Sequence, residues 1–297
     1  MNFYKNGNYI VCMMDDGTKI RHTKDDEFHP RFAENCDVKI TDKCSIGCPF
    51  CYEGCTAHGQ YADLLSYSFL KTLHPFTELA INGNDMDHPQ LNAFLSILKY
   101  HKVYANITVH QMQFMKNYDR IKQLSEVNLI YGIGVSYQQY DDEFIQRIKE
   151  FPNAVLHTIN GLLSQEDVKK LSNHDLKLLI LGYKDLGRGT TYHHSRGKNL
   201  ISKNQAWMYQ NIESMVHDGG FKTILFDNLA IEQLDIKHIM TPDEWDKFYM
   251  GDDGQFTFYI DMVRGEFAKN SISQVRYPIT DDMTIDDMFN KIRNEKV

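Results

Sequence analysis

The sequence has no long hydrophobic run, and no apolar stretch approaches the roughly 18 residues that a membrane-spanning helix requires. Its first residues, Met1-Asn2-Phe3-Tyr4-Lys5, lack the apolar core of a secretory signal. Positive charge is also in deficit, because 32 Lys and Arg residues stand against 40 Asp and Glu residues, for a net charge of −8. We therefore expect a cytoplasmic protein with no membrane partner, and we expect nucleic acid to be disfavoured as a partner.

Cysteine is scarce and unevenly placed, with six in 297 residues and none after Cys55. Cysteines spread in pairs are typical of disulfide-bonded secreted proteins, whereas a tight group fits a reducing compartment. Because no cysteine follows Cys55, we expect no second cysteine-bound cluster in the C-terminal part of the chain. We expect Cys12 and Cys36, which lie outside the group, to pack as small buried residues.

The group itself contains Cys44, Cys48 and Cys51 in the spacing C-x3-C-x2-C, directly after the apolar stretch 38–41. Three thiolates on one short loop can hold three irons of a [4Fe–4S] cube and leave the fourth iron open, whereas a structural site normally uses four protein ligands. An open iron is a place for chemistry. The aromatic Phe50 precedes the last cysteine and is suited to shield the cluster or to stack on a ligand.

Cys55 makes a second arrangement possible, in which four thiolates bind one zinc ion or a fully ligated iron–sulfur cluster. Four ligands within twelve consecutive residues are cramped for zinc, since zinc sites usually join two separated cysteine pairs. The three-cysteine cluster is favoured, and both four-thiolate alternatives stay open.

The cysteine spacing together with Phe50 resembles the signature loop of the radical S-adenosylmethionine (SAM) superfamily. This resemblance implies a cluster whose open iron is chelated by the amino and carboxylate groups of SAM. It also implies cleavage of SAM to a 5′-deoxyadenosyl radical, which abstracts a hydrogen from the substrate. An external electron donor such as flavodoxin or ferredoxin would supply the electron.

The same resemblance implies SAM contacts at several strand ends. Asn82, Gly83 and Asn84 resemble the Gly-Gly-Glu-Pro segment that holds the SAM amino group, with Gly83 matching in place and Asn84 standing for the glutamate. Ser136 resembles the polar position that contacts the ribose or the carboxylate. Further positions resemble those near the adenine, in two strand-end pairs: Ile159 with Gly161, and Leu181 with Gly182.

Strand-like and helix-like patterns alternate after the cysteines. Strand-like runs lie at 78–81, 103–109, 129–135, 154–159, 176–181 and 223–226. Helix-like runs lie at 61–73, 91–98, 119–126, 142–150, 165–171 and 205–216. Alternation of this kind demands parallel strands with crossover helices. We therefore predict an α/β fold, a partial (β/α) barrel of about six parallel β/α units, with ligand groups at the carboxyl ends of its strands.

Both ends of the chain lack this alternation of strand-like and helix-like runs. Residues 8–12 and 18–21 flank an Asp-Gly turn and predict a β-hairpin, so we assign residues 1–35 to an N-terminal appendage. The core follows at 36–240. We assign 241–297 to a C-terminal extension, in which 256–261 and 266–268 predict a second hairpin and 285–293 a final helix.

Polar groups near the strand ends are candidates for a substrate pocket: His110, Gln111, Tyr137, His157, Tyr183, Lys184, Asn228 and Glu232. The Gly- and His-rich stretch 187–198 predicts a long loop that covers this region as a lid. We expect its adjacent His193 and His194 to be solvated, because no partner motif accompanies them.

The sequence thus predicts a radical SAM enzyme. We favour a peptide or protein substrate, because hairpins before and after the core offer sheet edges to which an extended peptide can add as a strand. A small metabolite or nucleobase is the alternative substrate. A non-catalytic sensor that binds zinc or an iron–sulfur cluster is the alternative of another class.

Overall fold

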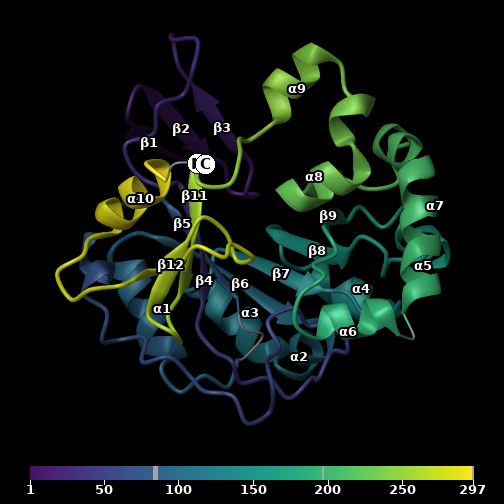
Figure 1. The fold of residues 1–297 in the computed structure, drawn as a ribbon, viewed down its shortest axis with the longest axis horizontal. Coiled ribbons are helices and arrows are strands. Elements are labelled where there is room, and N and C mark those ends of the chain that lie inside the picture. The colour runs from purple at the N-terminus through teal and green to yellow at the C-terminus, as the bar shows by residue number, and fades with distance from the viewer. Residues whose placement is uncertain (83–85, 196, 296–297) are drawn as a thin grey trace.

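The computed structural model describes residues 1–82, 86–195 and 197–295, and it contains two β-sheets (Figure 1). The smaller sheet is antiparallel, with strands in the order β1 (Asn2–Asn6), β2 (Tyr9–Met13) and β3 (Lys19–His22). The predicted N-terminal hairpin is confirmed in β2 and β3. The first strand, β1, is an addition that the sequence pattern did not predict.

Cys12 lies on the outer face of this small sheet. It stands opposite Phe3 on β1 and Ile20 on β3, which are 60% and 50% exposed, and it is itself partly exposed. The prediction that Cys12 is buried is therefore wrong, because alternation along β2 turns Val11 and Met13 inward instead.

The larger sheet is mostly parallel. Within the described residues its strand order is β10-β9-β8-β7-β6-β5-β4-β11-β12-β13, with β10 and β13 at the two edges. Its strands are β4 (Asn35–Lys39), β5 (Glu78–Asn82), β6 (Tyr104–His110), β7 (Gly132–Ser136), β8 (Ala154–Ile159), β9 (Lys177–Leu181), β10 (Thr223–Phe226), β11 (Thr257–Asp261), β12 (Glu266–Ala268) and β13 (Tyr277–Pro278). Strands β4 to β10 and β11 pair in parallel, and β12 and β13 pair antiparallel. The predicted α/β class is confirmed, in an open sheet.

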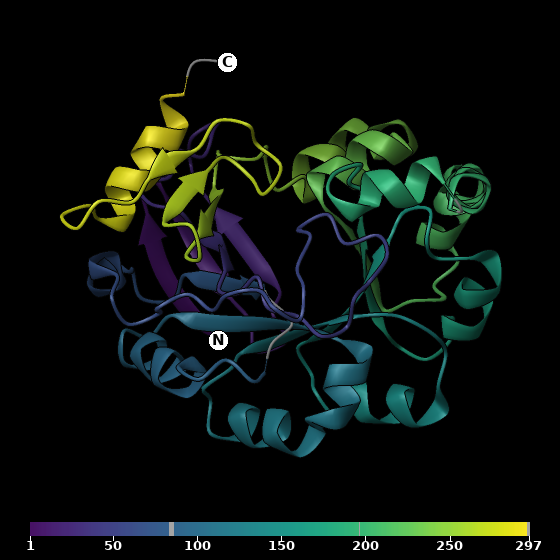
Figure 2. The ribbon, with the colours of Figure 1, turned by 60° about the horizontal axis from the view of Figure 1, so that its bottom comes forward.

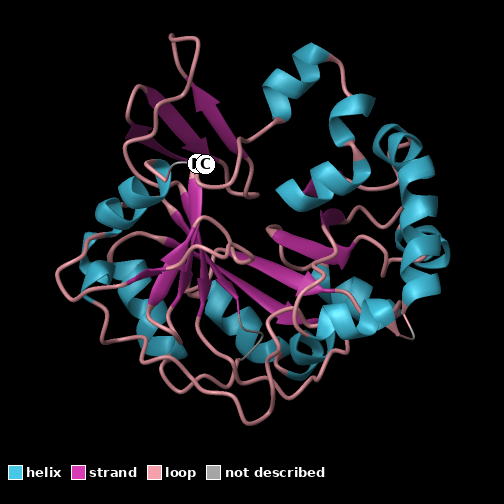
Figure 3. Ribbon diagram, viewed as in Figure 1, coloured by secondary structure: helices cyan, strands magenta, loops and turns pink. Residues whose placement is uncertain are grey.

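Ten α-helices are described, most of them between strands (Figure 3). They are α1 (Leu91–Tyr100), α2 (Gln111–Lys116), α3 (Tyr118–Glu126), α4 (Asp142–Ile148), α5 (Gln165–Leu171), α6 (Arg188–His194), α7 (Lys198–His217), α8 (Asn228–Leu234), α9 (Pro242–Phe248) and α10 (Ile285–Arg293). Two 3₁₀ turns lie at Ser68–Thr72 and Ile236–Ile239. None of the helices in these ranges combines the length and apolar character needed to cross a membrane.

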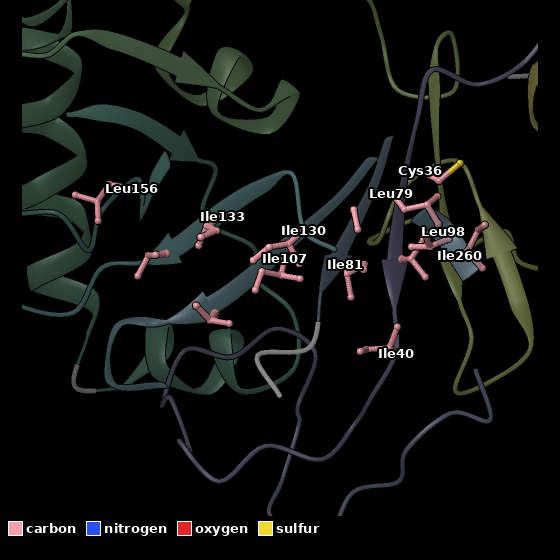
Figure 4. Packing of buried hydrophobic residues seen from close by; sticks show 14 of the residues in the cluster. Cys36, Ile40, Leu79, Ile81, Leu98, Ile107, Ile130, Ile133, Leu156 and Ile260 are labelled. Atoms are coloured by element: carbon pink, nitrogen blue, oxygen red, sulfur yellow. The ribbon is translucent and has the colours of Figure 1, made fainter. Parts of the chain in front are cut away.

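The core lies between the large sheet and the helices on one of its faces. Side chains that alternate along the parallel strands point to this face, and Leu98 of α1 packs against them (Figure 4). Cys36 belongs to this core at 3% exposure, as predicted, and burial raises the pKa of its thiol. The blue and teal helices cover this face (Figure 2). The yellow helix α10 packs on the same face beside β11, where the Phe289 and Phe258 ring centroids are 6.1 Å apart. The small purple sheet lies at the amino ends of the strands, where Asn2 donates to Tyr104 of β6 and Lys19 pairs with Glu78 of β5.

Two local predictions are wrong. Residues 61–73 form no α-helix, and their regular structure is limited to the short 3₁₀ turn. The Leu64 N–H donates to the Gln90 side chain at 2.7 Å instead of to a helical carbonyl group. Leu65 is 44% exposed, so it does not belong to a buried helical face. The predicted loop 187–198 contains α6 and the start of α7. In both segments contacts with distant residues decide the backbone, and periodicity cannot register them.

The C-terminal strands belong to the large sheet. Strand β11 pairs in parallel with β4, and β12 continues outward from β11, so the predicted hairpin is confirmed as part of the main sheet. The helix α10 is confirmed, with Thr284 and Asp287 forming a capping box at its start. The division of the chain at residues 35 and 240 stays a prediction.

Candidate functional site

The three cysteines lie on one irregular segment, the cysteine loop (residues 41–61), which leaves the carboxyl end of β4 and returns beside it. Ala62 N–H donates to Ile40 O at 3.0 Å and closes the segment at its base. Further along, Cys44 N–H donates to Thr56 O at 2.8 Å. These bonds fix the loop at the edge of the sheet where parallel strands end, which is where ligand groups gather in such folds.

Cys44, Cys48 and Cys51 form no disulfide, and all three residues are partly exposed. Cys51 N–H donates to Cys48 O at 3.2 Å, which forms a tight turn between the last two cysteines. Gly47 and Gly54 adopt φ angles of +69° and +68°, a conformation that glycine tolerates best, with open space where a side chain would stand. The loop therefore presents three accessible thiols on one short turn.

The thiols of the loop differ in acidity. A hydrogen bond from the Cys55 thiol, together with the Arg188 guanidinium, lowers the pKa of Cys51. The same hydrogen bond, and then burial, raises the pKa of Cys55, while burial raises the pKa of Cys48. Cys51 is therefore the more readily ionised thiol of this hydrogen-bonded pair, and the thiolate is the form of cysteine that binds metals.

The donor set suits a cluster better than a single ion. Among the described residues, the group of three His, Cys, Asp or Glu ligand atoms that all lie within 4.8 Å of one another is Asp185, His193 and His194, and no three cysteine sulfurs form such a group. A [4Fe–4S] cube offers a different iron to each thiolate, and its ligand sulfurs must therefore be spread. Three partly exposed cysteines on one loop offer the number of thiolate ligands that such a cluster takes when one iron stays open.

The helix α6 braces the cysteine loop from the side. Arg188 Nε donates to Cys48 O at 3.0 Å and Nη1 donates to Cys55 O at 2.8 Å. Its backbone N–H donates to Cys51 O at 3.1 Å, and Tyr192 meets Phe50 edge-on with ring centroids 6.1 Å apart. Phe50, predicted to shield the cluster, thus lies between the loop and α6. Sequence reasoning missed Arg188, since a lone arginine in a segment expected to be a loop gives no signal.

The buried ammonium group of Lys39 also holds the cysteine loop in place. Lys39, at 3% exposure, lies 2.6 Å from Asp42, 2.7 Å from Glu53 and 3.5 Å from Asp261 of β11. Burial alone would lower the pKa of Lys39, but Glu53 and the other carboxylates raise it above its usual value. The lysine therefore stays charged and joins two points of the cysteine loop to the neighbouring strand.

The predicted SAM-contact residues that the structure describes lie at the same edge. Asn82 ends β5, Ser136 ends β7, Ile159 ends β8 and Leu181 ends β9, with Gly161 and Gly182 just beyond. Strand register aligns Ile159 with Leu181. These residues and the cysteine loop therefore lie along one edge of the same sheet, and their contact with SAM stays a prediction. Gly83 and Asn84 lie outside the described residues.

Two of these glycines have a packing role. A Cβ at Gly182 would lie 2.4 Å from Leu229 Cγ of α8, and one at Gly161 would lie 2.8 Å from Ile201 of α7. Gly161 also has a φ of +95°. Their identity is therefore explained by helix packing, so it does not by itself indicate a ligand.

Several candidates for the substrate pocket form structural hydrogen bonds. Tyr137 donates to Asp167 at 2.8 Å, Tyr183 donates to Gly189 O at 2.8 Å, and Asn228 donates to Asp253 at 2.7 Å. These bonds use the two tyrosine hydroxyl groups and the amide nitrogen of Asn228. The three side chains therefore have a structural role, and these contacts do not by themselves indicate a substrate pocket.

Two ionisable groups stand on the face of the sheet opposite the core. His157 of β8 lies directly over Gly134, and burial lowers its pKa to about 4. Asp37 of β4 was missed from the sequence. Burial raises the pKa of Asp37 to about 6, with Lys184 acting in the opposite direction. A charged residue between buried Cys36 and Val38 is the signal that could have revealed it.

The fold and this edge define an α/β protein with an open, mostly parallel sheet and a cysteine loop after its first parallel strand. No family model matches the chain, and no curated protein sequence matches it. Among solved structures, the fold is similar to Streptococcus suis SuiB bound to S-adenosylmethionine, with a TM-score of 0.56 and 12% sequence identity. The match covers 90% of this chain and 69% of SuiB. At this identity the likeness concerns the fold.

Proposed function

We propose that the chain is a radical SAM enzyme. The observation that carries the proposal is the set of three accessible thiols, Cys44, Cys48 and Cys51, on one loop at the carboxyl edge of a parallel sheet. The likeness of the fold to SuiB, whose structure holds S-adenosylmethionine, supports it. In this proposal the open sheet acts as a partial (β/α) barrel.

The three cysteines would hold a [4Fe–4S] cluster, which when bound supplies the electron that cleaves SAM to a 5′-deoxyadenosyl radical. Arg188 keeps the cysteine carbonyls in place, and Phe50 covers the side of the loop that faces α6. Asn82 and Ser136 would orient SAM through their amide and hydroxyl groups. Gly83 and Asn84 would complete the contact to its amino group.

The substrate that we favour is a peptide or protein side chain. The small sheet has two edge strands, β1 and β3, and the large sheet ends in β10 and β13. Edge strands offer unpaired backbone groups to which an extended peptide can add. A small metabolite or nucleobase is the alternative, and flavodoxin or ferredoxin is the proposed electron donor.

Anaerobic reconstitution tests the proposal. The parent should bind about four irons per chain and form 5′-deoxyadenosine from SAM under a strong reductant. Changing Cys44, Cys48 or Cys51 to Ala should abolish both, whereas Cys12→Ala, a matched control on β2, should change neither. Cleavage retained in any of the three variants would refute the proposal.

Cys55→Ala separates the remaining arrangements. If Cys55 donates a hydrogen bond to Cys51 and is no ligand, the variant keeps its iron and its cleavage of SAM. Loss of the cluster would indicate four-thiolate ligation instead. A parent that binds iron or zinc and forms no 5′-deoxyadenosine would be the sensor.

A further inference from the structure

Asp185, His193 and His194 converge at one point beside α6. Asp185 lies shortly after β9, and the two histidines end the helix. His193 Nδ1 lies 3.1 Å from Asp185 Oδ2, and His194 Nε2 lies 3.6 Å from the same oxygen. From the sequence alone, these histidines are expected to be solvated and without a partner. The turn of the chain before α6 provides one.

Their distances fit ligands of one small cation. Zinc binds imidazole nitrogen and carboxylate oxygen at about 2.0 Å, so tetrahedral geometry places two such ligand atoms about 3.3 Å apart. The two distances to Asp185 lie on either side of this value, and one ligand atom from each of the three residues lies within 4.8 Å of the others. Asp185 and His194 are 43% and 64% exposed, so water has access to a fourth position.

The surrounding contacts hold the ligand groups in orientation. The His193 ring meets the Tyr183 ring edge-on at 5.7 Å, and Tyr183 OH donates to Gly189 O of α6 at 2.8 Å. A hydrogen bond from His193, and one from Thr190, lower the pKa of Asp185, so its carboxylate is ionised at neutral pH. Contacts of this kind fix the rings and carboxylates of metal sites.

We infer that Asp185, His193 and His194 form a binding site for a divalent transition-metal ion of the Zn²⁺ class. Two imidazoles and one carboxylate suit Zn²⁺ and its neighbours in the first transition row better than Mg²⁺ or Ca²⁺, which prefer oxygen. The ion would join the segment before α6 to the end of that helix. Because Arg188 of α6 donates to Cys48 O and Cys55 O, this closure would also stiffen the brace on the cysteine loop.

The inference needs none of the cysteines, so its test is separable from the proposed enzyme activity. The full chain is reconstituted with iron and sulfide to occupy its thiols and then titrated with Zn²⁺ against a chromophoric chelator. We expect one tight zinc per chain. His194→Gln and Asp185→Asn should each weaken this binding by about tenfold or more, whereas His238→Gln, at an exposed histidine outside the group, should leave it unchanged.

A second arm uses the full chain with Cys44, Cys48 and Cys51 all changed to Ala. Zinc binding that persists there and is lost on adding His194→Gln supports the site, whatever the outcome for iron and SAM. Equal zinc affinity in the parent and in His194→Gln would overturn the inference. The inference would also be overturned if the parent bound no zinc tightly, or if the triple cysteine variant with His194 intact lost its zinc binding.

Discussion

Single residues in this protein are constrained by neighbours that the sequence pattern does not reveal, and Gly182 is an example. Its N–H donates to Asp227 Oδ1 at 2.8 Å, and its missing side chain lets Leu229 of α8 approach β9. Gly182→Ala should therefore lower the free energy of unfolding by about 1–3 kcal/mol through overpacking. Urea denaturation measures the loss.

Adding Leu229→Ala to Gly182→Ala should restore part of this stability, because it removes the nearest atom that the new methyl group meets. An additive double variant would show that the two positions are not in contact. SAM binding measured on Gly182→Ala below its unfolding transition then reports any ligand role separately from packing.

His157 predicts a pH dependence of stability. Burial lowers the pKa of His157 to about 4, while a histidine in the unfolded chain has a pKa of about 6.5. Between these values the unfolded state binds more protons than the folded state, so stability is present above pH 6.5 and is lost as the pH falls toward 4. The loss from this group is about 3 kcal/mol.

Urea midpoints at pH 7, 5.5 and 4 check this expectation. His157→Gln should lose less stability on acidification than the parent, whereas His238→Gln, at an exposed histidine, should follow the parent. Parallel curves for the parent and His157→Gln would mean that the ring titrates normally in the folded protein.

Among the elements, α6 has the most direct bearing on the cysteine loop. Arg188→Ala removes both side-chain donors to Cys48 O and Cys55 O, while Arg188→Lys keeps the charge and loses the fork of two donors. Arg188→Ala should lower the free energy of unfolding by about 1–3 kcal/mol and should reduce iron retention after reconstitution. Arg188→Lys should fall between the parent and the alanine variant.

Arg147→Ala is the control for this experiment, since Arg147 makes a surface ion pair with Glu143 within α4. Its effect should stay below about 0.5 kcal/mol. If Arg188→Ala retained iron as well as Arg147→Ala does, α6 would lie beside the cysteine loop without stabilising it.

The sequence predicted most elements because their signals are local. Alternation and helical periodicity within a window suffice for strands such as β8 and helices such as α10, and cysteine spacing suffices for the loop. Residues 61–73 failed because the Gln90 side chain takes a backbone N–H of that segment. The partners of Arg188 and His193 could not be predicted, because they lie in segments whose approach depends on the whole fold.

Across the whole molecule, the small sheet is joined to the large one by a buried carboxylate. Glu34, with no exposure, accepts from Arg21 Nε at 2.9 Å and Nη2 at 3.2 Å, while Lys19 lies 2.8 Å from Glu78 of β5. Glu34→Gln leaves the cations of β3 without their shared partner. It should therefore lower the free energy of unfolding by about 3–5 kcal/mol.

Hydrogen exchange in Glu34→Gln should also accelerate first in β1 to β3, because the broken contact joins that sheet to the start of β4. Glu143→Gln, at a carboxylate 62% exposed, is the control and should change neither quantity appreciably. A uniform acceleration over both sheets would show that Glu34 supports the entire fold and not this junction.

Because β11 pairs with β4, the strand beside the cysteine loop gains this neighbour only late in the synthesis of the chain. About 220 residues separate the two strands, so at about 5–20 residues per second β11 leaves the ribosome roughly 10 to 45 seconds after β4. During that interval one edge of β4 has no neighbour, and Lys39 has no Asp261. The nascent chain thus carries an open strand edge beside its cysteines, a surface for chaperones and a hazard for aggregation.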